Sequence, residues 1–259
     1  MKSVASRVNL LGIGVVILVI ALWELLVATG IVHLSFLPTP VDVARSFGTL
    51  SSNGELWHNL GHTTVAAVEG WAIAAVVGGL LGLLLALVTP IWRYSMATIE
   101  VLRAIPIVAF VPVAVLIFGF TSKMEIVLAF YAAVWPIVVN TVVGVAGTSA
   151  QTLDVGRAMH LSKLAQIWSL RLPDATATIV VGLRLGLSLS LVLVIVSELT
   201  GNPAGIGYAI AQAGQSLHSG DMVAYIISVG ILGLLFNTIL VGLARILFRG
   251  QMAAAGDQA

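Results

Sequence analysis

Ionisable side chains inside otherwise apolar stretches are the residues of this 259-residue chain with the clearest chemical potential. Glu100 and Arg103 are three residues apart, so one helix face would carry both, as a local ion pair or along a solute pathway. Glu24, Glu69 and Glu198 lie toward the ends of apolar stretches, where a carboxylate can reach the aqueous interface. We favour that interface position over solute contact for these three residues.

The sequence contains none of the catalytic or metal-binding motifs that we considered. His58 and His62 are four apart, but Asn59 replaces the Glu of the zinc motif H-E-x-x-H, so we interpret them as a solvated helix face and predict no metal site. No G-x-x-x-x-G-K-[ST] run is present to cradle the phosphates of ATP, and the absence of cysteine excludes thiolate catalysis. We therefore expect no catalytic residues and no cofactor bound by this chain.

The composition is that of a membrane protein. Hydrophobic residues make up 59% of the chain and charged residues 9%, whereas soluble domains are about 25% charged. A net charge of +1 gives no electrostatic footprint for nucleic acid. Long apolar runs without strand-like alternation predict helices rather than a β-barrel.

Six apolar stretches are long enough to span a bilayer, because ~30 Å of hydrocarbon needs about 20 residues at ~1.5 Å each. They cover residues 10–28, 64–88, 96–120, 126–146, 176–199 and 223–247. The first exceeds the apolar core of a signal peptide and should remain as an anchor. We predict an all-α membrane protein, a six-transmembrane-helix bundle forming one domain over residues 1–259.

The distribution of basic residues predicts that both termini are cytoplasmic. With that orientation only Arg45 and Lys123 lie outside. Arg103 and Arg184 fall within spans, toward their inner ends, where long side chains can snorkel. The basic residues then placed inside are Lys2, Arg7, Arg93, Arg157, Lys163, Arg171, Arg245 and Arg249.

Prolines identify the spans that should face protein or water. Pro106 and Pro112 interrupt the third span and Pro136 the fourth, and backbone groups freed by proline must find partners inside a membrane. We therefore expect these two spans to line a route for solute. The candidate pathway residues are Glu100, Arg103, Pro106, Trp135, Asn140, Ser188 and Glu198.

Small residues and two outer loops complete the organisation. Ser188 could line the route or pack between helices, whereas the pairs 78/82 and 182/186 of spacing G-x-x-x-G indicate close helix packing. After the turn at 37–40, apolar residues at 41, 43, 47 and 50 predict an amphipathic helix along the outer surface. The Gly-rich stretch 201–220 could re-enter the membrane, form an outer gate or lie on the surface as a loop.

The inside loop at 148–173 predicts two short helices. Thr152 can cap the first helix, with Asp154 favourably placed in its first turn. Apolar residues at 161, 164, 167 and 168 give the second helix one apolar face, and Pro173 helps to end it. A bend near His160 would make a compact cytoplasmic knob, and a helix lying on the lipid surface is the alternative.

This loop resembles the signature loop of permease subunits of bacterial ATP-binding cassette importers. In that signature Glu-Ala-Ala is followed after three residues by Gly and then by a distal Leu-Pro. Leu172-Pro173 match the Leu-Pro, Asp154-Val155-Gly156 occupy the Glu-Ala-Ala positions, and His160 occupies the Gly position. His is among the residues enriched at positive φ after Gly. The resemblance implies that the surface contacting the ATPase comprises Asp154, Val155, Gly156, Arg157, His160, Leu161, Leu172 and Pro173.

The resemblance covers nearly the whole chain and points to the branch of nitrate, taurine and alkanesulfonate importers. Its motifs are Leu37-Pro38-Thr39-Pro40, Leu102-Arg103-Ala104-Ile105-Pro106, Phe118-Gly119, Gly182-Leu183-Arg184-Leu185-Gly186, Glu198-Leu199-Thr200-Gly201 and Gly205-Ile206-Gly207-Tyr208. It implies a non-catalytic permease subunit of the bacterial inner membrane that forms a homodimer. Its partners would be two ATPase subunits, which use ATP and Mg, and an external substrate-binding protein.

Two alternatives to a sulfonate, taurine or nitrate importer remain open. Similar permeases are also associated with pyrimidine precursors of thiamine. An ion-coupled secondary carrier would need no ATPase, but it often shows inverted repeats, which this sequence lacks, and it would leave the large inside loop unexplained.

Overall fold

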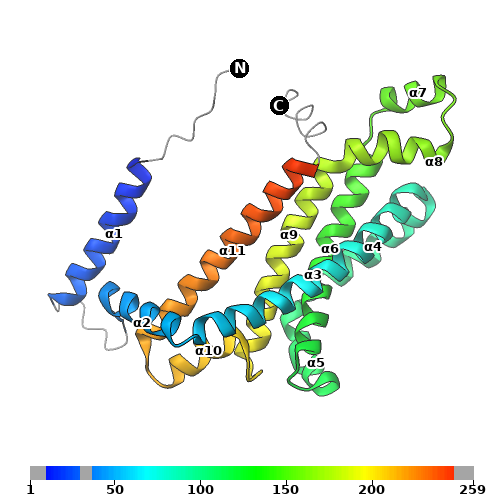
Figure 1. Ribbon diagram of the computed structural model, residues 1–259. Coiled ribbons are helices and arrows are strands. Elements are labelled where there is room, and N and C mark those ends of the chain that lie inside the picture. The colour runs from blue at the N-terminus through cyan, green and yellow to red at the C-terminus, as the bar shows by residue number, and fades with distance from the viewer. Residues whose placement is uncertain (1–9, 30–36, 248–259) are drawn as a thin grey trace.

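The computed structural model describes residues 10–29 and 37–247, and the regular elements in those ranges are all helical (Figure 1). Helices suit apolar stretches because they pair the backbone polar groups within the segment. In chain order they are α1 (Leu10–Ala28), α2 (Pro40–Ser52), α3 (Glu55–Leu87), α4 (Thr89–Ala104), η1 (Ile107–Phe110), α5 (Val111–Phe118), α6 (Ser122–Ala146), α7 (Ala150–Ala158), α8 (Lys163–Gln166), η2 (Ile167–Arg171), α9 (Leu172–Leu199), α10 (Gly205–Gln215) and α11 (Ser219–Leu247).

Within residues 10–29 and 37–247, four helical runs are long and apolar enough to cross a membrane, and a bent pair of helices could supply a fifth crossing. The four are α3, α6, the run from α8 through η2 to α9, and α11. The α3 helix begins nine residues before the expected start at 64. Helix α1 occupies the expected residues 10–28, and its crossing of the membrane stays a prediction.

The expected third span is broken in the middle. The pieces on either side of the break, α4 and the η1–α5 segment, are bent by 72° relative to each other. Pro106 accounts for the break, because proline disfavours helical geometry at the residue before it, and Ile105 has an extended conformation (φ −70°, ψ 123°). Pro112 lies in the first turn of α5, where proline is tolerated.

Pro136 does not interrupt its helix. Helix α6 continues through this residue from Ser122 to Ala146, so the expected break in the fourth span is wrong. The Asn140 side-chain amide donates to the Pro136 carbonyl oxygen (2.8 Å). The helices packed around α6 hold it in place despite the proline.

Helices α3, α6 and α9 pack together at the centre of the molecule, and glycine allows their close approach. A Cβ atom on Gly82 of α3 would lie 2.7 Å from Thr141 Cβ, and one on Gly182 of α9 would lie 2.6 Å from Asn140 Cβ. Gly78 and Gly186 meet the same helix, α6. The predicted packing role of both G-x-x-x-G pairs is confirmed.

The amphipathic helix predicted after residue 40 is confirmed as α2. Thr39 caps it, because its hydroxyl accepts from the Asp42 backbone N–H (3.1 Å) and the Asp42 carboxylate accepts in return. Val43 and Leu50 are buried in a cluster that includes Ile206 of α10. The Gly-rich stretch therefore contains a short packed helix.

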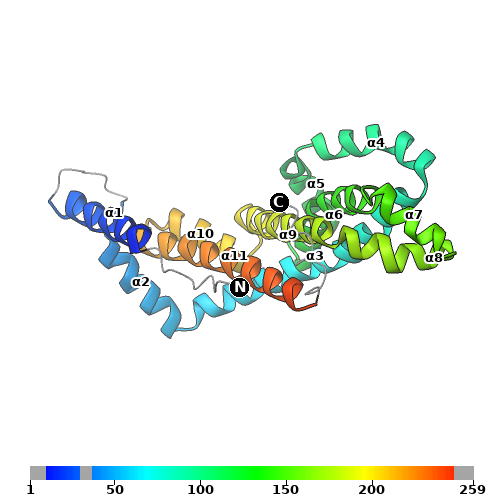
Figure 2. The ribbon, with the colours of Figure 1, turned by 90° about the horizontal axis from the view of Figure 1, so that it is seen from above.

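Different short helices lie at the two ends of the bundle. Figure 1 shows α7 and α8 at the same end as the start of α1 and the finish of α11, whereas α2, α5 and α10 lie at the opposite end. We call α7, α8, η2 and the bend between α7 and α8 the knob, and we call the opposite end the α10 end. Seen from above, α1 lies at one edge of the molecule and α7 with α8 at the opposite edge (Figure 2).

Candidate functional site

The first half of the knob is a capped helix. Ser149, rather than the expected Thr152, is its N-cap, and the Ser149 hydroxyl accepts from the Thr152 backbone N–H (3.1 Å). Asp154 and Arg157, one turn apart, form an ion pair (2.9 Å) whose side chains are more than half exposed. An exposed pair of this kind contributes about 1 kcal/mol or less, so it shapes the surface more than it stabilises the knob.

The bend falls at His160, as predicted. His160 has φ +51°, a left-handed conformation that glycine adopts most readily. Its N–H donates to the Arg157 carbonyl oxygen and the Leu161 N–H donates to the Gly156 carbonyl oxygen, both at 3.0 Å. These two bonds form a Schellman motif, so the bend is built although glycine is absent.

The second half of the knob runs directly into a long helix. Ser162 caps α8 by accepting from the Ala165 N–H (3.2 Å), and a π-helical turn then leads to Leu172. Pro173 was expected to end the short helix, but it lies in the first turn of α9 inside a continuous helical run. The second half of the knob and α9 thus form one continuous helical run.

The knob presents apolar side chains to its surroundings. Gly156 is buried against Leu170, because a Cβ atom there would lie 2.6 Å from Leu170 Cδ1. The two halves therefore pack face to face, and their outer faces carry exposed apolar residues. The exposed fractions are Val155 56%, Met159 65%, Leu164 66% and Trp168 64%.

A cavity of about 330 Å³ lies beside the break between α4 and η1. Arg103, Pro106 and Trp135 line it, together with Pro136 of α6 and Leu189 of α9. Three of the seven predicted pathway residues therefore come together in one place. Of the two possibilities considered for Arg103, the ion pair with Glu100 is absent, and the side chain lines this cavity instead.

The other four predicted pathway residues do not line that cavity. Glu100 and Ser188 are exposed, and the Ser188 hydroxyl donates to the Arg184 carbonyl oxygen of its own helix. Asn140 packs against Gly182. Glu198 is fully buried at the α10 end, so its expected position at the interface is wrong.

A buried polar network surrounds Glu198. Its carboxylate accepts from the Thr63 hydroxyl (2.7 Å) and from the Gly207 backbone N–H (2.8 Å). The Ile206 backbone N–H in turn donates to the Thr63 oxygen (2.9 Å). These bonds attach the first turn of α10 to α3 and α9.

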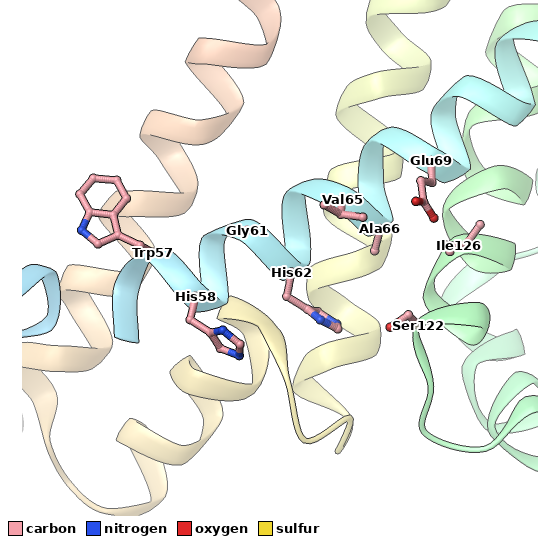
Figure 3. Close-up of a pocket in the computed structure, with 9 residues that line it drawn as sticks. All are labelled: Trp57, His58, Gly61, His62, Val65, Ala66, Glu69, Ser122 and Ile126. Atoms are coloured by element: carbon pink, nitrogen blue, oxygen red, sulfur yellow. The ribbon is translucent and has the colours of Figure 1, made fainter. Parts of the chain in front are cut away.

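A second buried carboxylate, Glu125 of α6, continues the network. It meets the His62 Nε2 atom at 3.0 Å and accepts from the Asn202 amide. The interpretation of His62 as part of a solvated face is therefore wrong, although its ring also borders a cavity of about 480 Å³ that contains His58 and Glu69 (Figure 3). The spacing within α3 gave no signal of a partner in another helix.

His62, Glu125 and Glu198 are also the one described group with the spacing of a metal site. One ligand atom from each lies within 4.8 Å of the others. Each carboxylate oxygen, however, already meets a hydrogen-bonding group of the protein. The network is therefore satisfied by protein groups, and we assign it a structural role.

These features define a class of protein: a helical membrane protein with a broken helix beside a cavity and a helical knob outside the bundle. The sequence comparisons name the family. Residues 74–252 match the family described as binding-protein-dependent transport system inner membrane component. The chain belongs to this family of permease subunits of ABC importers.

Relatives with assigned names agree with this family. The chain is 30% identical to the putative aliphatic sulfonates transport permease protein SsuC of Bacillus subtilis (strain 168), over 92% of this chain and 86% of the relative. It is 32% identical to the protein of the same name in Escherichia coli (strain K12), over 83% and 82%. It is 30% identical to the nitrate import permease protein NrtB of Leptolyngbya laminosa, over 74% and 68%.

Solved structures show the same fold. The chain resembles an inward-facing structure of the MetNI methionine ABC transporter with a TM-score of 0.62 and 19% identity, over 71% of this chain and 92% of that one. A second inward-facing structure of that transporter gives a TM-score of 0.59.

Proposed function

We propose that this chain forms the translocation pathway of an ATP-driven importer for a small anion, such as an aliphatic sulfonate, taurine or nitrate. The relatives named above as sulfonate and nitrate permeases support this substrate class, and so does a relative named as a taurine transport system permease. The named relatives do not discriminate among these anions, so the substrate must be tested directly.

The observation that carries the proposal is the knob. Apolar side chains exposed outside a bundle mark a surface that a partner covers, and the knob joins α9 without a break. An ATPase subunit that binds the knob could move α9, and with it the wall of the cavity at Leu189. The partner would supply ATP and Mg²⁺, because this chain has no phosphate-binding loop.

The assembly we propose contains two copies of this chain, two ATPase subunits at the knob end and a substrate-binding protein at the α10 end. The knob end would then be cytoplasmic, and both termini would lie on that side of the inner membrane. The start of α1 and the finish of α11 at the knob end support this orientation (Figure 1).

Reconstitution tests this function. The chain is placed in proteoliposomes with a candidate ATPase and binding protein, and uptake of radiolabelled butanesulfonate, taurine and nitrate is measured with and without ATP. We expect uptake of one of these anions that requires ATP and the binding protein. Uptake driven by an ion gradient alone would instead support the secondary carrier, and ATP-dependent uptake of only a thiamine pyrimidine precursor would replace the anion assignment.

A further inference from the structure

We propose that the cavity beside the helix break is a transient binding site for an organic anion with a short apolar chain, the alkanesulfonate class, with Arg103 holding its charged group. This inference rests in part on the proposed function, because it selects one substrate class among those considered there. It also predicts a property of the chain alone, which can be measured without any partner.

Charge is the first argument. Of the described residues that line the cavity, Arg103 alone is charged, and no carboxylate lies among them to neutralise it. Glu100, the nearest acidic residue in sequence, forms no ion pair with it. An unpaired cation within a membrane-spanning region is unfavourable, so it needs an anion or water as a partner. A guanidinium also matches the geometry of an oxoanion, because its donors form a planar fork.

The remaining lining is the second argument. Leu189 and Leu193 of α9 and Pro106 at the break form an apolar wall, and the ring of Trp135 faces the same space. Such a wall gains nothing from an inorganic anion such as nitrate, but it can cover the alkyl chain of an alkanesulfonate at about 0.8 kcal/mol per buried CH₂ group. The volume of about 330 Å³ is at the lower end of ligand cavities, which suits a short chain.

Two aromatic residues supply the third argument. The Tyr131 hydroxyl is already used, because it donates to the Leu102 carbonyl oxygen (3.2 Å). The buried indole N–H of Trp135, in contrast, has no hydrogen-bond acceptor within the described chain. This nitrogen has almost no accessible surface in the present conformation, so an anion oxygen would satisfy the donor, whose isolation costs about 1–3 kcal/mol, after a shift of the Trp135 ring.

Single cysteines test the site directly, because the natural chain contains none. Leu189→Cys places a thiol in the cavity, and Ser188→Cys places one on the neighbouring, exposed position of the same helix at nearly the same depth. Each purified variant is labelled with anionic sulfonatoethyl methanethiosulfonate and with its cationic trimethylammonium counterpart. The measured quantity is the ratio of the anionic to the cationic labelling rate.

We expect this ratio to be about tenfold higher at Cys-substituted Leu189 than at Ser188, because a cation raises the local concentration of anions. Arg103→Gln should abolish the difference and Arg103→Lys should keep most of it, whereas the control Arg184→Gln, one turn from Ser188 on the same helix, should not reduce it. Butanesulfonate should slow labelling only at the cavity position, and equimolar nitrate should not. An unchanged unfolding midpoint in mixed micelles shows that a variant is folded.

Equal ratios at the two positions, or a difference that survives Arg103→Gln, would overturn the site. Nitrate protection equal to that by butanesulfonate would overturn its preference for an organic anion. The failure of the proposed function is distinguishable, because labelling requires neither ATPase nor binding protein. Loss of ATP-dependent uptake together with an unchanged labelling pattern would contradict the importer function, whereas the anion-binding site would still be supported.

Discussion

The two ends of this molecule differ in whether their charged side chains are buried or exposed. At the α10 end, Glu198 and Glu125 are fully buried and hydrogen-bonded to groups on other segments. At the knob end, the Asp154–Arg157 ion pair is exposed, and apolar residues such as Met159 are exposed beside it. The carboxylates at the α10 end have their hydrogen-bonding partners within the chain, whereas the knob exposes a charged pair and apolar side chains together.

The contrast separates the residues that stabilise the fold from the residues that could couple the chain to a partner. A buried network is costly to break, because each donor left without a partner loses about 1–3 kcal/mol. An exposed ion pair adds about 1 kcal/mol or less. Substitutions in the buried network should therefore destabilise the chain, whereas substitutions of exposed residues on the knob should leave it folded and change what it binds.

The largest effect is expected for Glu198→Ala. This change removes the acceptor of both the Thr63 hydroxyl and the Gly207 N–H, so the free energy of unfolding should fall by about 3 kcal/mol. Unfolding of the purified chain in mixed micelles measures it. Glu69→Ala, an exposed Glu on α3, is the matched control and should stay within about 0.5 kcal/mol of wild type. Equal losses in the two variants would show that the hydrogen bonds of buried Glu198 do not stabilise the fold.

A smaller loss is expected where α3 meets α6. Gly82→Ala places a Cβ atom 2.8 Å from the Val138 carbonyl oxygen, so we expect the free energy of unfolding to fall by about 2 kcal/mol. Gly79→Ala on the same helix meets nothing within 4 Å and should be neutral or stabilising by about 1 kcal/mol or less. The same unfolding assay compares them, and similar behaviour of the two variants would contradict the close helix packing.

The bend of the knob should respond to the residue at His160. Its φ of +51° is unfavourable for a β-branched side chain, so His160→Val should destabilise the bend by about 1–2 kcal/mol. His160→Gly should keep the bend. Amide hydrogen exchange at Leu161, whose N–H closes the motif, reports the effect. Faster exchange in the Gly variant than in the Val variant would show that the bend does not depend on left-handed geometry.

Much of the fold could be predicted because its causes are local. The break at Pro106, the bend at His160 and the packing of Gly82 each follow from what one residue type permits in a backbone. The helical ranges follow from the length of apolar runs for the same reason. These predictions needed no knowledge of which helices are neighbours.

The buried network could not be predicted, because its partners are distant in sequence. Thr63 and Glu198 are 135 residues apart, and a Glu near the end of an apolar stretch is equally compatible with the interface and with burial. His62 looked solvated for the same reason. The prediction that Pro173 helps to end the short helix was wrong, because a proline that can end one helix is also favoured in the first turn of the next.

The measurement that tests the central claim most directly is copurification of the tagged chain with a candidate ATPase. Wild type is compared with a variant carrying Val155→Asp and Met159→Asp on the knob, and with Leu217→Asp, an equally exposed apolar residue at the α10 end. We predict that wild type and Leu217→Asp retain the ATPase, while the knob variant loses it with an unchanged unfolding midpoint. Retention of the ATPase by the knob variant at the wild-type level would contradict the knob as the coupling surface.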